Sequence, residues 1–301
     1  MRSYRRPVNV AILSAERGWH TDQLQRAFAE RGLASDVLPI DALVARTGAS
    51  PRLAAAGVPL DGLRGVLVRL IPRGSLEQTI FRVDALHRLE NLGVPVVNPA
   101  RVIEKTVDKF YTSTLLEDAG LPTPRTVVAE TLDDAMAAFV AFGDVIVKPL
   151  FGSNGRGMVR VEDEEVAYRV FRALELERAV YYIQQMIPHD GRDVRAFVAG
   201  GRVIAAASRR SPGWRTNVSR GGVVEALDLP AEWEALALRA AEVVGAEYCG
   251  VDLLPARDGT VYVLEVNGIP GWRGLQSTTD VDIAGAIVDH LRAKLEARAA
   301  T

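Results

Sequence analysis

Residues 249–273 read CGVDLLPARDGTVYVLEVNGIPGWR, and this stretch decides how the fold of the chain is interpreted. Two apolar runs, Gly250–Leu254 and Thr260–Val266, flank a polar segment that contains Asp258–Gly259. An Asp-Gly pair between two alternating apolar runs is a strong signal for a β-hairpin. The stretch therefore predicts two antiparallel strands joined by a tight turn.

Three oxygen-bearing side chains meet on one face of this predicted hairpin. The turn places Asp252 opposite Glu265, and Asn267 shares the face of Glu265 because side chains alternate along a strand. Two carboxylates directly opposite each other destabilise a strand pair. A hard cation between them would remove the conflict, and Mg²⁺ prefers such oxygen ligands. On these residues alone, a hairpin with a solvated face stays an open alternative.

The composition narrows the class of protein. A chain of 301 residues is long for one domain and suggests two or three lobes, and 48% hydrophobic residues support a sizeable core. A net charge of −2 implies no bulk attraction to nucleic acid or to a membrane. The single cysteine, Cys249, excludes an intrachain disulfide and a cysteine-rich zinc site. The first apolar run is too short to span a membrane, so we expect a soluble cytoplasmic protein.

Strands and helices alternate over the first hundred residues, which predicts a small parallel α/β lobe. The predicted strands are Val8–Ser14, Ser35–Ile40, Arg64–Leu70 and Val94–Asn98, with helices at Asp22–Arg31 and from Ser75 to Asn91. Ser75 and Gln78 match a capping box. We expect Trp19, His20 and His87 to be packing or surface residues and predict no catalytic group in this region.

The remaining chain continues with strands and helices after a proline-rich boundary near residues 120–124. Helices are predicted at 108–118, 131–142, 162–176, 230–244 and 282–295, and strands at 125–128, 144–148, 180–186, 194–198, 203–207 and 223–227, besides the hairpin.

A glycine-rich loop follows the predicted strand that ends at Lys148. Gly152–Gly157 contains three glycines in six residues, so its backbone N–H groups could cradle phosphate oxygens. Lysine is rare, with four among 36 basic residues, which draws attention to Lys109 and Lys148. A flexible hairpin is the alternative interpretation of the glycines.

Seven arginines and only one acid, Asp193, lie between Arg192 and Arg220. This run predicts a local cationic surface, and arginine forks suit phosphate or carboxylate ligands. Nucleic acid is a weaker candidate because Trp214 stands alone and no aromatic ladder accompanies the arginines.

Taken together, these motifs resemble the ATP-grasp superfamily, and within it the RimK-like alpha-L-glutamate ligases. The matching segments occur in the family's order over roughly residues 98–298: 108–109, 147–149, 152–157, 184–187, 193–195, 215–222, 250–252 and 265–267. The resemblance implies an α/β fold of the α+β ATP-grasp type, in which two lobes clamp ATP. The expected domains are an N-terminal parallel α/β lobe at 1–98, a small lobe at 99–186 and a large lobe at 187–301.

The resemblance also implies a nucleotide site and a metal site. Lys109 and Lys148 would contact the phosphates of ATP, and Asp193 would hold the ribose. Other expected nucleotide-binding residues are the loop residues Gly152, Ser153, Gly155 and Gly157 and the adenine-pocket residues Gln185, Met186 and Ile187. One or two Mg²⁺ ions, which Mn²⁺ could replace, would be bound by Asp252, Glu265 and Asn267. Family members commonly have an acid at the position of Gln185, but a main-chain contact to adenine would survive that change.

The implied reaction is ATP-dependent amide formation through an acyl phosphate. Arg195, Arg215, Asn217 and Arg220 would stabilise that intermediate and orient the carboxylate substrate. We expect L-glutamate or a similar amino acid as the amine and a pterin coenzyme tail as the acceptor. Gly268–Ile269 and Trp272 depart from the family pattern and could reshape the acceptor pocket. Trp272 could stack on a flat ring, although packing in the core is the more common role of such a residue.

Three other functions stay open at this point. The acceptor could be a protein C-terminus, the enzyme could transfer phosphate to a hydroxyl, or the chain could be an ATP-binding regulatory module. A nucleic-acid binder that uses the arginine-rich run is a further alternative, but we expect neither nucleic acid nor membrane as a partner. We also expect a homo-oligomer.

Overall fold

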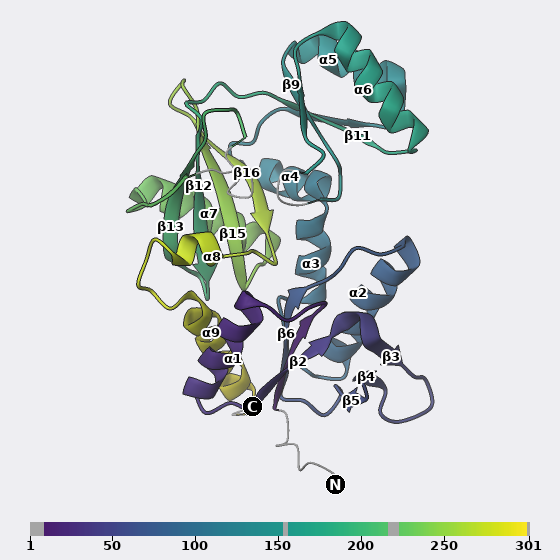
Figure 1. The fold of residues 1–301 in the computed structure, drawn as a ribbon, viewed down its shortest axis with the longest axis vertical. Coiled ribbons are helices and arrows are strands. Elements are labelled where there is room, and N and C mark those ends of the chain that lie inside the picture. Colours follow the sequence, from purple (N-terminus) through teal and green to yellow (C-terminus); the bar gives the residue numbers. More distant parts are fainter. Residues whose placement is uncertain (1–8, 153–155, 216–222, 300–301) are drawn as a thin grey trace.

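The computed structural model describes residues 9–152, 156–215 and 223–299. Figure 1 shows the N-terminal sheet at one end of the molecule, a small lobe at the other end and a large antiparallel sheet between them. Within the described residues, no helix is long and apolar enough to cross a membrane.

The N-terminal lobe is built on a parallel sheet with strand order β2-β1-β6-β7, as the strand–helix alternation predicts. The capping box also forms, because the Gln78 N–H donates to Ser75 Oγ at 3.2 Å. Two features were not predicted: a small antiparallel sheet, β3-β4-β5, and the helix α3. The elements are β1 Val10–Ser14, α1 Trp19–Glu30, β2 Ser35–Pro39, η1 Ile40–Ala42, β3 Leu43–Ala45, β4 Leu53–Ala55, β5 Val58–Pro59, β6 Gly65–Leu70, α2 Leu76–Asn91, β7 Val96–Val97, α3 Ala100–Val107 and α4 Lys109–Asp118.

The small lobe is a four-stranded antiparallel sheet, in the order β10-β9-β11-β8, with α5 and α6 on one face (Figure 1). Val145 and Val147 of β9 pack against these helices. The alternate residues Ile146 and Lys148 therefore point to the opposite face. The elements are β8 Thr126–Ala129, α5 Leu132–Phe142, β9 Val145–Lys148, β10 Val159–Val161, α6 Glu164–Leu176 and β11 Tyr181–Gln185.

The large lobe is an antiparallel sheet in the order β14-β13-β12-β15-β16, with α7 packed on one face. Val194, Ala196 and Val198 of β12 pack toward α7. Arg195 and Phe197 alternate with them and face the other way. The elements are β12 Arg192–Ala199, β13 Arg202–Arg210, β14 Val223–Ala226, α7 Ala231–Val244, β15 Tyr248–Pro255, β16 Val261–Asn267, α8 Arg273–Gln276 and α9 Ile283–Ala299.

The N-terminal and large lobes are tied together in two ways. Helix α9 packs against α1, and both contribute to a core that also contains Phe197 and Trp272. The fully buried Asn98 donates to the carbonyls of Tyr248 and Gly268, each at 2.6 Å, and its Oδ1 accepts from the Glu247 N–H at 2.7 Å. The predicted domain boundaries at residues 98 and 186 stay a prediction.

Candidate functional site

The predicted hairpin forms, and its register brings the expected carboxylates together. β15 and β16 are antiparallel, with Asp252 opposite Glu265 and Gly250 opposite Asn267. The neighbouring strand β12 places Arg195 directly across from Asp252. Gly250 makes room for that arginine, because a Cβ there would lie 3.4 Å from Arg195 Cδ and 3.1 Å from Pro270 Cβ. The sheet face opposite α7 therefore carries acids and arginines side by side.

Asp252 is held by two arginines rather than facing Glu265 alone. Arg195 forms a fork on it, with Nε to Oδ1 and Nη2 to Oδ2 both at 2.6 Å. Arg209 Nη2 lies 3.0 Å from Asp252 Oδ2 and also binds the buried Asp193. Burial opposes ionisation of Asp252, but the two guanidiniums outweigh it and hold the pKa of that carboxyl well below its usual range. The four side chains form one charge-balanced network.

The donor chemistry of the hairpin fits a hard divalent cation. Glu265 is partly exposed, and Asn267 Nδ2 donates to Glu265 Oε1 at 2.9 Å, so the Asn267 Oδ1 oxygen is turned away from that bond. Two carboxylates and an amide oxygen match the ligands that Mg²⁺ prefers. Of these three residues, Asp252 is the one whose two carboxylate oxygens already accept hydrogen bonds from Arg195. A cation at Asp252 would therefore compete with Arg195 for the same oxygens.

Lys148 ends β9 on the face of the small lobe that is turned toward the hairpin. Its ammonium donates to Gln184 Oε1 at 2.6 Å, and Gln184 is in turn held by Thr126 at 3.1 Å. Burial lowers the pKa of Lys148 to about 8, although Glu265 nearby opposes that shift. The lysine is thus a buried cation with a neutral partner, which favours an anionic ligand.

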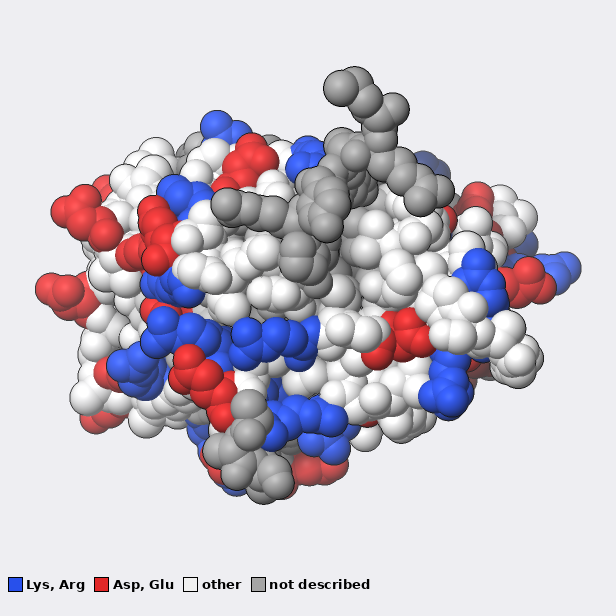
Figure 2. Space-filling model, turned by 90° about the horizontal axis from the view of Figure 1, so that it is seen from below, with Lys and Arg blue, Asp and Glu red and all other residues white. Residues whose placement is uncertain are grey.

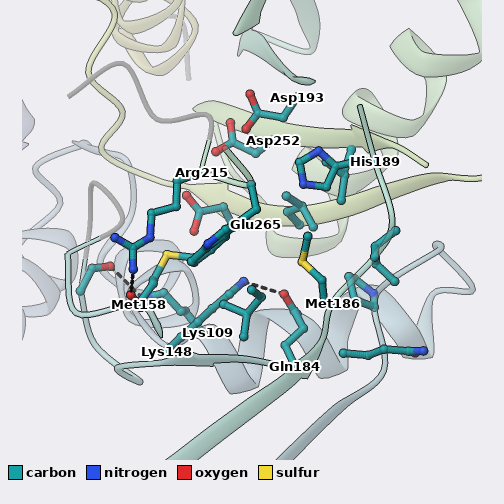
Figure 3. Close-up of a pocket in the computed structure, with 18 of the residues that line it drawn as sticks. Lys109, Lys148, Met158, Gln184, Met186, His189, Asp193, Arg215, Asp252 and Glu265 are labelled. Carbon is teal, nitrogen blue, oxygen red and sulfur yellow. Dashed lines mark hydrogen bonds between the residues drawn. The ribbon is translucent and has the colours of Figure 1, made fainter. Parts of the chain in front are cut away.

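Lys109 connects the start of α4 to the glycine-rich loop. Its Nζ donates to the carbonyls of Gly152 at 2.7 Å and Leu150 at 3.3 Å. Asp108 caps α4 by accepting from the Tyr111 N–H at 3.0 Å. Burial lowers the pKa of Lys109 as well. Figure 3 shows Lys109 and Lys148 across the pocket from Asp193 and Asp252.

These groups line one pocket between the small lobe and the large sheet (Figure 3). Of the residues that the sequence predicted for this site, it brings together Lys109, Lys148, Gly152, Gln185, Met186, Ile187, Asp193, Arg215, Asp252 and Glu265. It also includes Gln184, His189 and Arg156, to which the sequence analysis gave no role in the site. Gln184 stands beside Gln185 in the quoted motif, and the alternation of β11 is the signal that would have placed it beside Lys148.

Three of the predicted site residues do not line this pocket, and four others are not among the described residues. Asn267 and Arg195 line a neighbouring cavity instead of this pocket, and Gly157 is described but is not among the lining residues. The main-chain N–H groups of Gln185 and Met186 are already bonded within the protein. They donate to the carbonyls of Arg125 and Asp144, at 2.8 and 2.9 Å respectively. Ser153, Gly155, Asn217 and Arg220 lie outside the described residues.

The predicted cationic surface is wrong for three of the seven arginines in the run. Arg195 and Arg209 turn inward and pair with Asp252 and Asp193, while Arg210 lies 3.7 Å from Glu225. The acids that neutralise them come mostly from other strands, so the local sequence does not show them. Figure 2, a view from the end of the N-terminal lobe, shows basic side chains interspersed with acidic ones on that face as well.

Trp272 does not offer a face for stacking on a ring. It is 1% exposed, and its ring packs against Trp19, His20 and Phe197, with the Arg69 guanidinium 5.1 Å from its centroid. The core role is the one that the structure supports.

A second cavity, of about 550 Å³, lies between the N-terminal lobe and the large sheet. Glu265 lines both cavities, so the hairpin forms part of the wall that they share. The residues of the second cavity that precede residue 100 include Glu16, Trp19, His20 and Arg69. Trp19 and His20 pack against Trp272, as expected of packing residues, and they also line this cavity. They meet the hairpin only through the tertiary fold.

Comparison with known proteins places this geometry among described enzymes. A model of the RimK-like ATP-grasp domain matches residues 106–291. The tetrahydromethanopterin:alpha-L-glutamate ligase of Methanococcus maripaludis is 34% identical over 287 residues, covering 94% of this chain and 97% of that protein.

Solved structures agree on the fold. A RimK domain ATP-grasp protein from Sphaerobacter thermophilus superposes with a TM-score of 0.73 at 26% identity, covering 94% of this chain and 99% of that one. The ATP-grasp ligase PsnB, solved with a minimal precursor, Mg and ADP, gives a TM-score of 0.75 at 23% identity, covering 97% and 100%.

Proposed function

Because the chain belongs to the RimK-like ATP-grasp family, we propose that it is a ligase that joins L-glutamate to a carboxylate-bearing acceptor and converts ATP to ADP and phosphate. The observation that carries this proposal is the position of Glu265, on the wall shared by a lysine-lined pocket and a second cavity. The acceptor that we favour is a pterin coenzyme tail, because the relative from Methanococcus maripaludis is named for that substrate.

The proposed reaction has two steps. A carboxylate oxygen of the acceptor attacks the γ-phosphorus of ATP, the bond to the bridging oxygen breaks, and ADP leaves with the electron pair. The glutamate amine then attacks the acyl carbon, phosphate leaves with the electron pair of the C–O bond, and the nitrogen loses a proton. Both steps build negative charge on oxygen, which preorganised cations stabilise.

Lys109 and Lys148 are the proposed phosphate ligands. Lys148 is buried and Lys109 is half-buried, and each donates to a neutral oxygen, Lys109 to Gly152 and Lys148 to Gln184. Phosphate oxygens would give both groups stronger, charge-assisted partners. Because Lys109 also holds the carbonyl of Gly152, phosphate binding and the position of the glycine-rich loop are linked through one side chain.

Two further sets of residues are proposed around the phosphates. Asp252, Glu265 and Asn267 would hold Mg²⁺, one ion or two, with Mn²⁺ as a possible replacement; the ion would serve as template and Lewis acid. Arg195 and Arg215, with Asn217 and Arg220, would orient the carboxylate and the acyl phosphate.

The base and the ribose of ATP are assigned more coarsely. Gln185, Met186 and Ile187 would contact the adenine, through carbonyl oxygens and the Ile187 amide, since the other two amides are already bonded. Asp193 would reach a ribose only while it also accepts from Arg209.

The test is product analysis with purified protein, ATP, Mg²⁺, isotope-labelled L-glutamate and a cell extract fractionated by size. We expect a product heavier by one or more glutamyl units, and ADP release that requires both the acceptor fraction and glutamate. Incorporation into the large-molecule fraction would favour a protein C-terminus over a coenzyme tail. A phosphorylated product without glutamate would replace the ligase with a phosphotransferase, and nucleotide binding without turnover would leave a regulatory module.

We also propose that the chain forms a homo-oligomer. Light scattering coupled to size-exclusion chromatography would measure its mass, and a monomer at all concentrations would refute the proposal.

A further inference from the structure

Arg69 is a buried cation that has no acidic partner among the described residues. Its side chain leaves β6 and the residue is only 8% exposed. Within the described residues its contacts include a 3.4 Å hydrogen bond to the Ile269 carbonyl, a hydrogen bond with the Tyr248 hydroxyl and the face of Trp272, and none of these partners is a carboxylate. Burial lowers its pKa, yet an arginine stays charged in a protein. Burying such a charge without an anion is unfavourable, so its position suggests that an anion arrives from outside.

The position of Arg69 in the sheet is one where α/β folds bind ligands. β1 continues through α1 to β2 on one side, whereas β6 continues through α2 to β7 on the other. The carboxyl ends of β1 and β6 therefore flank the point at which the strand order reverses, and the crevice there is the usual ligand site of an open parallel sheet. The second cavity lies at this point, lined by Ser14 and Glu16 after β1 and by Arg69 and Leu70 of β6.

The cavity carries an excess of positive charge around Arg69 and Arg273. Arg195 and Arg209 also line it but are neutralised by Asp252 and Asp193. Arg69 and the exposed Arg273 form no ion pair with a described acid, and Glu16 is exposed to solvent. The cations that remain for a ligand are thus Arg69 and Arg273.

Of two neighbouring features, the helix α1 strengthens this field and His20 leaves it unchanged. The N-terminus of the twelve-residue helix α1 lines the same cavity through Gly18 to Thr21; its N-cap residue Gly18 has no side chain, and Thr21 Oγ1 accepts from the Gly18 N–H at 2.8 Å. His20 accepts the Trp272 N–H at 3.1 Å, and burial together with Arg69 and Arg273 lowers the pKa of His20 to about 4. The imidazole is therefore neutral at pH 7 and adds no charge of its own.

We propose that Arg69, assisted by Arg273, binds a second carboxylate of the substrate, distinct from the carboxylate that is activated near Glu265. This inference rests on the proposed ligase function and deepens it. Arg69, Glu265 and Asn267 line the same cavity. A dicarboxylate that spans it places one group on the cation and the other beside the hairpin, which makes Arg69 a determinant of substrate specificity.

The carboxylate could belong to the incoming amino acid or to the acceptor, and two probes separate these sources. L-Glutamate carries an amine and represents the amino acid. Glutarate has two carboxylates and no amine, so it represents the acceptor. Calorimetric titration of each probe into protein saturated with Mg²⁺ and ADP measures binding without turnover.

We expect Arg69→Met to weaken binding of at least one probe by about 10- to 100-fold, the usual effect of losing a charged hydrogen-bond partner. The affinity for ADP should change less than about twofold. Arg69→Lys should recover part of the lost affinity. A loss confined to L-glutamate assigns the carboxylate to the amino acid, and a loss confined to glutarate assigns it to the acceptor.

Arg82→Met is the matched control. Arg82 is 6% exposed, donates to the Pro72 carbonyl at 2.9 Å and lies outside the cavity, so its replacement tests the general effect of removing a buried arginine. Arg273→Met removes an exposed cation from the cavity and keeps the proposal testable if Arg69→Met does not fold. Its expected effect is a loss of about 3- to 10-fold.

The proposal is overturned if the wild type binds neither probe, or if folded Arg69→Met and Arg273→Met bind both as the wild type does. Failure of the ligase function gives a different pattern. In that case no glutamyl product forms in the extract, while Arg69-dependent binding of a dicarboxylate persists.

Discussion

ATP affinity should fall steeply with pH because of one lysine. Lys148 is 9% exposed and donates to the neutral Gln184, and burial lowers its pKa to about 8 in the nucleotide-free protein. Phosphate oxygens beside the ammonium would raise that pKa, so the protonated lysine is the form that binds. Affinity should therefore be constant well below pH 8 and decline above it.

The size of the decline follows from the charged fraction. With a pKa of about 8, the fraction of charged Lys148 drops from about 90% at pH 7 to about 10% at pH 9. Affinity should fall about tenfold over that range, equivalent to about 1.4 kcal/mol. Lys109, whose pKa burial also lowers, would steepen the decline at higher pH.

Calorimetric titration with Mg²⁺ and ADP at pH 7, 8 and 9 measures this effect. Lys148→Arg keeps a charge throughout the range and should flatten the profile, whereas Lys148→Met should be both flat and weaker. A wild-type profile that does not change with pH, or a Lys148→Arg profile that falls as steeply as the wild type, would refute the reasoning.

Three further outcomes are expected. Glu265→Ala should lower turnover by at least about 100-fold with an unchanged melting temperature, and normal turnover in the folded variant would remove the metal assignment. Gly250→Ala forces its Cβ toward Arg195, so turnover should drop several-fold and the unfolding free energy measured in urea should fall by about 1–3 kcal/mol. Gly62→Ala is the control: it has open space around it and should change neither quantity. Asn98→Ala should reduce the urea unfolding free energy by about 3 kcal/mol, because it leaves buried main-chain groups unpaired; an unchanged midpoint and slope would contradict that role.

The ATP-grasp fold and its family were predictable from the sequence because their signals are local. The Asp258–Gly259 turn fixed which residues face each other, and the register of Asp252 with Glu265 is confirmed. Sequence signals for helix ends were weaker where one helix directly follows another. The helix α3 was missed because Asp108 both ends it and caps α4, with no glycine or proline between the two.

Side-chain partners were less predictable, because they depend on residues that the fold brings from afar. Arg195 pairs with Asp252, a residue 57 positions further along the chain, so an arginine that looked unpaired in the sequence is neutralised by a neighbouring strand. The second cavity joins the ends of β1 and β6 to the hairpin. No pattern within the first hundred residues indicates that Arg69 and His20 lie there.

The charges of the nucleotide pocket imply that Arg195 would move if a cation bound at Asp252. Lys109, Lys148, Arg156 and Arg215 line the pocket, and of its carboxylates Asp193 and Asp252 are already paired with arginines. A cation at Asp252 would add positive charge beside Arg195 and take the oxygens that this arginine holds. Repulsion would favour Arg195 turning toward the second cavity, which it already lines. Binding of the cation, which completes the phosphate site, would then bring the Arg195 guanidinium to the carboxylate substrate. Nucleotide binding should therefore strengthen substrate binding.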